Sequence, residues 1–302
     1  MANILFLYFS APQRNPAHMK KNIPTAFETV SGLGPISDNY DALFCDIWGV
    51  IHNGQIPFHE ACDALERFRQ ERGPVILISN SPRPSVAIPE QFRQIGVPGE
   101  LWDAIVTSGD ATIDELSRRA PGPAFKLGPE RDDPLYAGLE LHFSDLDDAA
   151  FISCTGLFED DHETPDDYTD LLSQAREQGL PLVCANPDIK VRRGDVEIYC
   201  GGALAQKYED MGGEVIYAGK PHQPIYRLCR AWLDDIMGYQ VQNDRVLCIG
   251  DNVHTDLAGA QNEDYDCYFI QDGLHGEMTA AFTKLLKQHN ISARYLGDRL
   301  RW

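Results

Sequence analysis

The chain has 302 residues, more than one domain usually contains, so we expect a large core with a smaller inserted or appended domain. Hydrophobic residues make up 43% and charged residues 24%, values that exclude a disordered chain and fit a globular enzyme. The 26 basic and 46 acidic residues give a net charge of −20, which disfavours nucleic acids and anionic membranes as partners. A small anionic substrate remains compatible with this charge if a local cation reverses the field within one pocket.

The beginning of the chain gives no sign of export or of membrane insertion. The apolar run Ile4–Phe9 follows no basic residue and is too short to cross a bilayer, so we expect residues 1–22 to be a loosely ordered tail. The eight cysteines show no CxxC spacing, and we expect them to be reduced and mostly buried. These features predict a cytoplasmic protein.

Short apolar runs then alternate with helix-like stretches, which is typical of an α/β fold built around a parallel sheet. Each run is short enough for a strand that is buried on both faces. The expected strands are Ala42–Cys45, Val75–Ile78, Ala104–Val106, Val215–Tyr217, Val246–Ile249 and Cys267–Ile270. The expected helices are Glu60–Gln70, Ser85–Ile95, Pro224–Asp234 and Thr255–Gln261.

The character of the chain changes between residues 108 and 199. An acidic stretch, Glu159–Asp170, precedes the strand-like segment Leu182–Ala185. We predict that residues 108–199 form a second domain inserted into a core made of residues 23–107 and 200–302. Because open parallel sheets bind ligands at the carboxyl ends of their strands, we expect the chemistry in the loops that follow the core strands.

Aspartates follow two of the expected core strands. Asp46 ends the first strand and precedes a glycine turn. A carboxylate at this place can attack phosphorus, although an aspartate at a strand end more often only forms a turn. Asp251 follows Val246–Ile249, and Asp256 lies in the next helical turn. Carboxylates on adjacent strand ends suit Mg²⁺, while Asp256 alone equally fits a carboxylate that stabilises the start of a helix.

Two other loops carry groups that bind phosphate. The Ser79 hydroxyl and the Asn80 backbone N–H follow an expected strand and can hold a phosphate. Lys220 can neutralise both a phosphate and the carboxylate of a nucleophile. Each feature alone is commoner as a simple turn or as a solvated lysine, but their order and their places after strands favour one shared site.

This set of motifs resembles that of the haloacid dehalogenase superfamily. The matching segments are Asp46-x-x-Gly49-Val50, Ser79-Asn80, Gly219-Lys220-Pro221 and Gly250-Asp251-x-x-x-x-Asp256. A narrower resemblance, to the class IIA group with its p-nitrophenylphosphatase-like and pyridoxal phosphatase-like enzymes, is carried by Thr107-Ser108-Gly109, Asn186-Pro187-Asp188 and Gly201-Gly202-Ala203. The resemblance implies a Rossmann-like core with a cap domain inserted after the third strand.

The resemblance also implies a role for each matching residue. Asp46 would be the nucleophile that becomes phosphorylated, Ser79 and Asn80 would bind the phosphoryl group, and Lys220 would stabilise its charge. The expected product is an aspartyl-phosphate intermediate formed from a small phosphorylated metabolite.

The metal site follows from the same resemblance. Asp46, the backbone carbonyl of Trp48 and Asp251 would bind Mg²⁺, and Asp256 would orient a metal-bound water. Related enzymes often dimerise through the cap, so a homodimer is also expected. Substrate choice would depend on the cap, where we expect Phe158, Asp188 and Arg192 to lie in segments that face the pocket.

Trp48 departs from the family pattern, because most phosphatases of this superfamily have at this position an aspartate that protonates the leaving oxygen. Indole cannot do this, and losing general acid–base help costs about 10²–10⁴ in rate. Three interpretations stay open: an enzyme for good leaving groups, His52 as a substitute acid or base rather than an ordinary turn residue, or a catalytically impaired protein that binds a phosphate or metabolite. The presence of Asp46, Lys220 and Asp251 together favours an enzyme.

Overall fold

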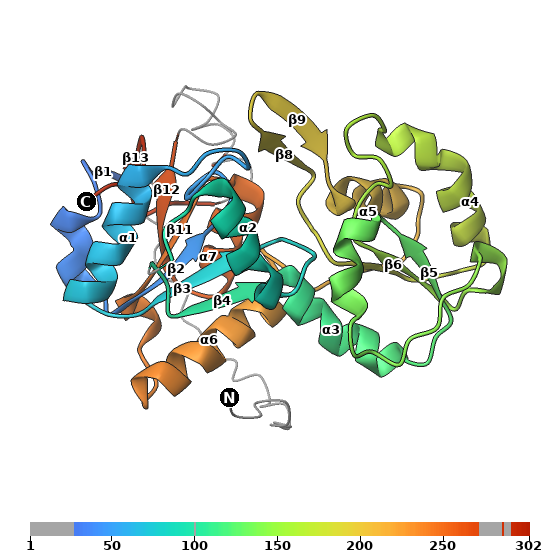
Figure 1. The fold of residues 1–302 in the computed structure, drawn as a ribbon, viewed down its shortest axis with the longest axis horizontal. Coiled ribbons are helices and arrows are strands. Elements are labelled where there is room, and N and C mark those ends of the chain that lie inside the picture. Colours follow the sequence, from blue (N-terminus) through green and yellow to red (C-terminus); the bar gives the residue numbers. More distant parts are fainter. Residues whose placement is uncertain (1–26, 100, 272–285, 287–290) are drawn as a thin grey trace.

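The computed structural model describes residues 27–99, 101–271, 286 and 291–302, and the predicted tail lies outside these ranges. Two parallel sheets lie apart in the molecule, each with its own helices (Figure 1). The larger sheet has seven parallel strands in the order β1-β13-β12-β11-β2-β3-β4. Its strands are β1 (Glu28–Thr29), β2 (Ala42–Asp46), β3 (Val75–Ser79), β4 (Ala104–Thr107), β11 (Val246–Gly250), β12 (Asp266–Ile270) and β13 (Tyr295–Gly297).

Helices cover both faces of this sheet. The alternation of side chains along a strand sends Leu43 and Cys45 into a buried cluster with α1 and α2, whereas Ala42 and Phe44 pack on the other face with α6 and α7. These helices are α1 (His59–Glu71), α2 (Ile88–Ile95), α6 (Gln223–Met237) and α7 (Ala258–Asn262). Because β2 is covered on both sides, it is apolar along its whole length until Asp46.

The smaller sheet has four parallel strands in the order β10-β7-β6-β5, and a separate antiparallel hairpin joins β8 to β9. The strands are β5 (Ala124–Leu127), β6 (Phe151–Cys154), β7 (Leu182–Cys184), β8 (Lys190–Arg193), β9 (Val196–Tyr199) and β10 (Val215–Tyr217). Helices α4 (Thr169–Glu177) and α5 (Gly201–Asp210) contribute Leu172 and Leu204 to its buried core. We call this part, with the hairpin, the cap.

Helix α3 (Ser108–Arg119) connects the two parts of the molecule. Ala111 packs in the core beneath the larger sheet, whereas Leu116 packs with buried residues of the cap (Figure 1). Thr107 begins the helix through a capping box with Asp110, in which each side chain accepts the other residue's backbone N–H. The helix therefore starts immediately after β4, at the point where the sequence predicts that the chain leaves the core.

The predicted return to the core at residue 200 is wrong. Helix α5 packs in the cap, and β10 pairs with β7, so the chain rejoins the core only after Tyr217. A three-residue apolar run such as Val215–Tyr217 predicts a strand but does not indicate which sheet it joins.

Several other expectations for the fold agree with the structure. The α/β class and the parallel core sheet are confirmed, and the predicted helix Thr255–Gln261 is a π-helical turn, Val253–Leu257, followed by α7. All eight cysteines are free and buried. No helix in the described ranges is both long and apolar enough to span a bilayer. Short 3₁₀ helices occupy Gly34–Asn39, Ser85–Ala87, Glu130–Tyr136, Leu146–Asp148, Pro165–Tyr168 and Asn243–Arg245.

Candidate active site

The carboxyl ends of the central strands bring the predicted site residues together. β2 pairs with β11 on one side and with β3 on the other, in a register that sets Cys45 opposite Ile249 and Asp46 opposite Ile78. Asp46, Asp251 and Ser79 therefore end neighbouring strands at one edge of the sheet. Asp46 and Asp251 are each 6% exposed and Ser79 is 7% exposed, so their polar groups lie in a largely dry environment.

Lys220 reaches this edge from the loop after β10. Its Nζ lies 2.5 Å from Asp46 Oδ1 and 2.7 Å from Asp256 Oδ1, and the side chain is 3% exposed. Burial alone would lower the pKa of Lys220, but the carboxylates of Asp256 and Asp46 outweigh it and raise this pKa above its ordinary value. Lys220 is thus a fixed positive charge between two carboxylates.

Three carboxylates converge here, with one ligand oxygen of each of Asp46, Asp251 and Asp256 within 4.8 Å of the others. Burial raises the pKa of Asp46 to about 7, and burial and the neighbouring Asp46 raise the pKa of Asp251. The Asp251 carboxylate accepts no hydrogen bond from any described residue. When all three carboxylates are ionised, they and the Lys220 cation carry a net charge of −2, and this set of hard oxygen donors then fits a divalent cation such as Mg²⁺.

Two glycines leave the space that these carboxylates occupy. A Cβ on Gly49, whose φ is +90°, would lie 2.0 Å from Asp251 Oδ2, and a Cβ on Gly250 would lie 2.2 Å from Asp256 Cγ. Asp256 Oδ2 accepts backbone N–H bonds from Asp251 and Asn252 at 3.2 and 3.1 Å. Asp256 is therefore held by Lys220 and the backbone, which suits an orienting role better than a direct metal contact.

Asn80 fixes the loop that carries the lysine. Its Oδ1 accepts the Lys220 backbone N–H at 2.8 Å, and its Nδ2 donates to the Lys220 carbonyl at 3.2 Å and to Asp188 Oδ1 at 2.9 Å. The Asn80 side chain therefore bonds to other parts of the protein. Its backbone N–H is the group that can contact a phosphate. Ser79 Oγ accepts the Ser81 backbone N–H at 3.2 Å, which leaves the hydroxyl hydrogen for another acceptor.

Trp48 touches the cap. Its Nε1–H donates to the carbonyl of Arg192 in β8 at 2.6 Å, and its ring lies so close to Gly54 that a Cβ there would be 2.5 Å away. A second contact joins the same hairpin to the core, because the Gly194 N–H donates to the Asn53 carbonyl at 3.1 Å. The residue that stands in place of the usual acid therefore holds the hairpin over the site.

The structure argues against an acid–base role for His52. The side chain is fully buried, and burial lowers its pKa to about 4, so the ring is neutral near pH 7. Nδ1 accepts the Gly54 N–H at 2.9 Å, which places the ring proton on Nε2, a buried atom with no hydrogen-bond partner. Within the part of the chain that the structure describes, this proton has no acceptor to which it could pass.

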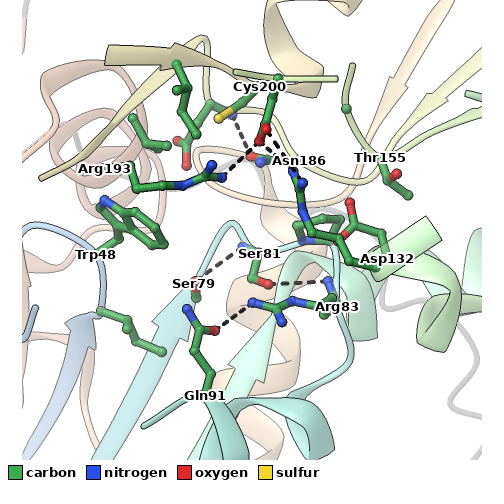
Figure 2. A pocket seen from close by; sticks show the side chains of 18 of the residues that line it. Trp48, Ser79, Ser81, Arg83, Gln91, Asp132, Thr155, Asn186, Arg193 and Cys200 are labelled. Atoms are coloured by element: carbon green, nitrogen blue, oxygen red, sulfur yellow. Dashed lines mark hydrogen bonds and ion pairs between the residues drawn. The ribbon is translucent and has the colours of Figure 1, made fainter. Parts of the chain in front are cut away.

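Two adjoining cavities open at this edge. The phosphoryl cavity is lined by Asp46, Ser79, Lys220, Asp251 and Asp256 among others, and the side cavity by Arg83, Gln91, Arg131, Asp132 and Arg193 among others. Trp48, Ser79, Asp188 and Val191 line both cavities. Figure 2 shows the side cavity, with Trp48 and Arg193 across from Ser79 and Arg83.

The cap residues expected near the pocket divide into two groups. Asp188 and Arg192 line the phosphoryl cavity, whereas Phe158 lines neither cavity and its ring instead lies against Tyr168, 5.9 Å between ring centres. Burial raises the pKa of Asp188, whose carboxylate accepts a hydrogen bond from Asn80.

Sequence reasoning missed Arg83, although its place between two prolines just after the Ser79-Asn80 loop was a usable signal.

Comparison with known proteins agrees with the motifs. A family model described as haloacid dehalogenase-like hydrolase matches residues 43–140, and a second, described as HAD-hydrolase-like, matches residues 217–298. A hydrolase of the haloacid dehalogenase-like family from Brucella suis is 40% identical, with 90% of this chain and 99% of that one covered and a TM-score of 0.83. The chain belongs to the haloacid dehalogenase-like hydrolases. This confirms the family that the sequence motifs predict.

More distant members of the superfamily share the fold. A protein described as a possible sugar phosphatase from Cytophaga hutchinsonii has a TM-score of 0.75 at 16% identity, with 91% of this chain and 98% of that one covered. A p-nitrophenyl phosphatase from Archaeoglobus fulgidus has a TM-score of 0.65 at 22% identity, with 85% and 95% covered. At these identities the likeness extends to the fold alone. A search of curated proteins found no match.

Proposed function

We propose that this haloacid dehalogenase-like hydrolase is a Mg²⁺-dependent phosphatase of small phosphomonoesters that works through phosphorylation of Asp46. The observation that carries the proposal is the buried cluster in which Lys220 bridges Asp46 and Asp256 while no described residue donates a hydrogen bond to the Asp251 carboxylate. A protein that only binds phosphate has no need of a carboxylate at this strand end, because a carboxylate repels the ligand. The related phosphatases of the same fold are consistent with this chemistry.

In the first step, one Asp46 oxygen forms a bond to phosphorus while the bond between phosphorus and the leaving oxygen breaks. The Ser79 hydroxyl, the Asn80 backbone N–H and the Lys220 ammonium hold the phosphoryl oxygens as their charge is redistributed. In the second step, water attacks the acyl phosphate, which releases inorganic phosphate and restores the Asp46 carboxylate. Asp256, fixed by two backbone N–H groups, would orient a water bound to the metal.

The donor set would hold Mg²⁺ through Asp46, Asp251 and the Trp48 carbonyl. Bound there, the ion would supply a positive charge that offsets the carboxylates and the substrate phosphate. Without this charge, the Asp46 carboxylate and a phosphate dianion repel each other, and Lys220 alone does not balance them.

Trp48 restricts the class of substrate, because it provides no proton for the leaving oxygen. We propose that turnover is fastest with aryl or acyl phosphates, whose leaving groups depart without being protonated. This preference distinguishes the protein from a phosphatase with an aspartate at this position.

The decisive experiment is hydrolysis of p-nitrophenyl phosphate with and without Mg²⁺, by the native protein and by Asp46→Asn. We expect Mg²⁺-dependent release of p-nitrophenol that Asp46→Asn abolishes while the circular dichroism spectrum is unchanged. Full activity in Asp46→Asn would end the proposed mechanism. No turnover by the native protein, with phosphate and Mg²⁺ still bound in calorimetry, would instead indicate a catalytically impaired phosphate- or metabolite-binding protein.

The cytoplasmic location and the homodimer remain predictions from the sequence. Eight free, buried cysteines are compatible with a reducing compartment. Light scattering coupled to gel filtration measures the oligomeric state directly.

A further inference from the structure

The side cavity offers space for the part of a substrate that leaves after phosphoryl transfer. It meets the phosphoryl cavity at Trp48, Ser79, Asp188 and Val191, which line both. A phosphomonoester whose phosphorus lies beside Asp46 therefore has its leaving group at this junction, and the rest of that group extends into the side cavity. The chemistry of the side cavity then selects the substrate.

Arg83 projects into the side cavity from a rigid segment of the core. Pro82 and Pro84 flank it, and its backbone N–H donates to Ser81 Oγ at 3.3 Å. Its guanidinium Nη2 donates to Gln91 Oε1 at 2.7 Å, as Figure 2 shows. This single contact with a neutral amide fixes the direction of the guanidinium and leaves most of its N–H donors for another group.

The three arginines of the side cavity differ in whether a nearby carboxylate neutralises their charge. Arg131 and Arg193 both pair with Asp160, at 2.5 and 2.9 Å. Arg83 has no carboxylate within 4.0 Å among the described residues. Burial lowers the pKa of Arg83, which is the expected effect of a half-buried cation without a close counter-ion.

Asp132 is the nearest source of negative charge for Arg83, but it acts only from a distance. Its side chain is 5% exposed and bonded to Thr155, and burial raises its pKa to about 6. Arg131 contributes more than Arg83 to stabilising the charge on Asp132. Asp132 thus leaves Arg83 incompletely neutralised and able to pair with a ligand anion.

We propose that Arg83 binds an anionic group on the leaving group of the substrate, either a carboxylate or a second phosphate. This rests on the proposed phosphatase function, because it takes the phosphoryl cavity as the place of the first phosphate. Substrates of this enzyme are then phosphomonoesters with two anionic ends. The planar guanidinium suits both kinds of anion, since it can donate two parallel hydrogen bonds to either.

The test uses Asp46→Asn, in which binding is measured without turnover, and two matched ligand pairs. 3-Phosphoglycerate against glycerol 3-phosphate tests a carboxylate, and fructose 1,6-bisphosphate against fructose 6-phosphate tests a second phosphate. We expect the doubly anionic member of one pair to bind about 10- to 100-fold more tightly by isothermal titration calorimetry. Adding Arg83→Met should remove that preference, and Arg83→Lys should restore part of it.

The matched control is Arg93→Met, which removes an exposed arginine of α2 that pairs with Glu90 and should change neither affinity. No preference for the doubly anionic ligand in either pair would overturn the proposal. An equal loss for both members of a pair in Arg83→Met would also overturn it, because Arg83 would then serve the first phosphate or the fold. Hydrolysis of p-nitrophenyl phosphate by the native chain tests the phosphatase function separately.

Discussion

Trp48→Asp restores the acid–base group that most enzymes of this superfamily carry, and its effect can be estimated from the site. A general acid contributes about 10²–10⁴ in rate for leaving groups that need a proton. The substitution also removes the hydrogen bond from Trp48 to the Arg192 carbonyl, which costs about 0.5–1.5 kcal/mol. This loss lowers the population of molecules whose hairpin is closed over the site by up to about tenfold. Hydrolysis of an alkyl phosphate should therefore rise by at least about tenfold.

The assay is kcat/KM for glycerol phosphate and for p-nitrophenyl phosphate at saturating Mg²⁺. Because p-nitrophenolate leaves without a proton, Trp48→Asp should lower its rate by up to about tenfold, so the ratio of the two rates rises by about 10²–10⁴. Trp48→Phe is the control: it removes the N–H but keeps a ring, and both substrates should slow equally. An unchanged ratio in Trp48→Asp would refute the reasoning and would mean that Trp48 acts through packing or substrate contact.

Two other predictions concern the charges of the site and of the side cavity. Mg²⁺ at about a hundred times its Kd should stabilise the native chain by about 2.7 kcal/mol, seen in calorimetry as a rise of about 4 °C in Tm, and Asp251→Asn should abolish the rise. An equal rise in the variant would show that the ion binds elsewhere. Asp132, with its pKa raised from 3.8 to about 6, favours folding while protonated, so the native chain should lose up to about 3 kcal/mol as pH rises from 4 to 7. Asp132→Asn should remove that part of the loss in urea titrations, and the same pH dependence in the variant would contradict this origin.

Sequence reasoning located the core strands and their loops because these signals are local. A strand buried on both faces is a short apolar run, and the polar residue that ends it marks the sheet edge, as at Asp46, Ser79 and Asp251. Successive motifs are separated by up to about 140 residues, and each is ambiguous alone, but their order and their places after strands could be recognised from the sequence. The sequence predicted that Lys220 can neutralise the carboxylate of a nucleophile, whereas its pairing with Asp256 is seen only in the structure.

The features that the sequence did not yield depend on contacts between distant segments. Val215–Tyr217 could be assigned to the cap only once its pairing with β7 was known. The contact of Trp48 with Arg192 likewise depends on where the hairpin lies in the folded chain. The place of Arg83 between two prolines was a usable signal, but its lack of a close carboxylate among the described residues is visible only in the folded chain. The sequence also suggested His52 as a substitute acid or base. Its burial, which lowers its pKa, cannot be seen from a single residue in the sequence.

The order of the strands has a consequence for biosynthesis. β2 pairs with β11, so that Ala42 lies beside Val246, about 200 residues later in the chain. During translation the cap strands β5 to β10 are all available before β11 emerges, and until then β2 can pair with β3 but its other edge stays open. Slow closure of this long-range pair should limit the rate of folding and expose the nascent chain to aggregation.

The same order delays the active centre. Asp46 is synthesised early, but the lysine and the two carboxylates that give it a function belong to the last third of the chain. A ribosome-bound chain that stops before Lys220 therefore carries a nucleophile without the groups that activate it.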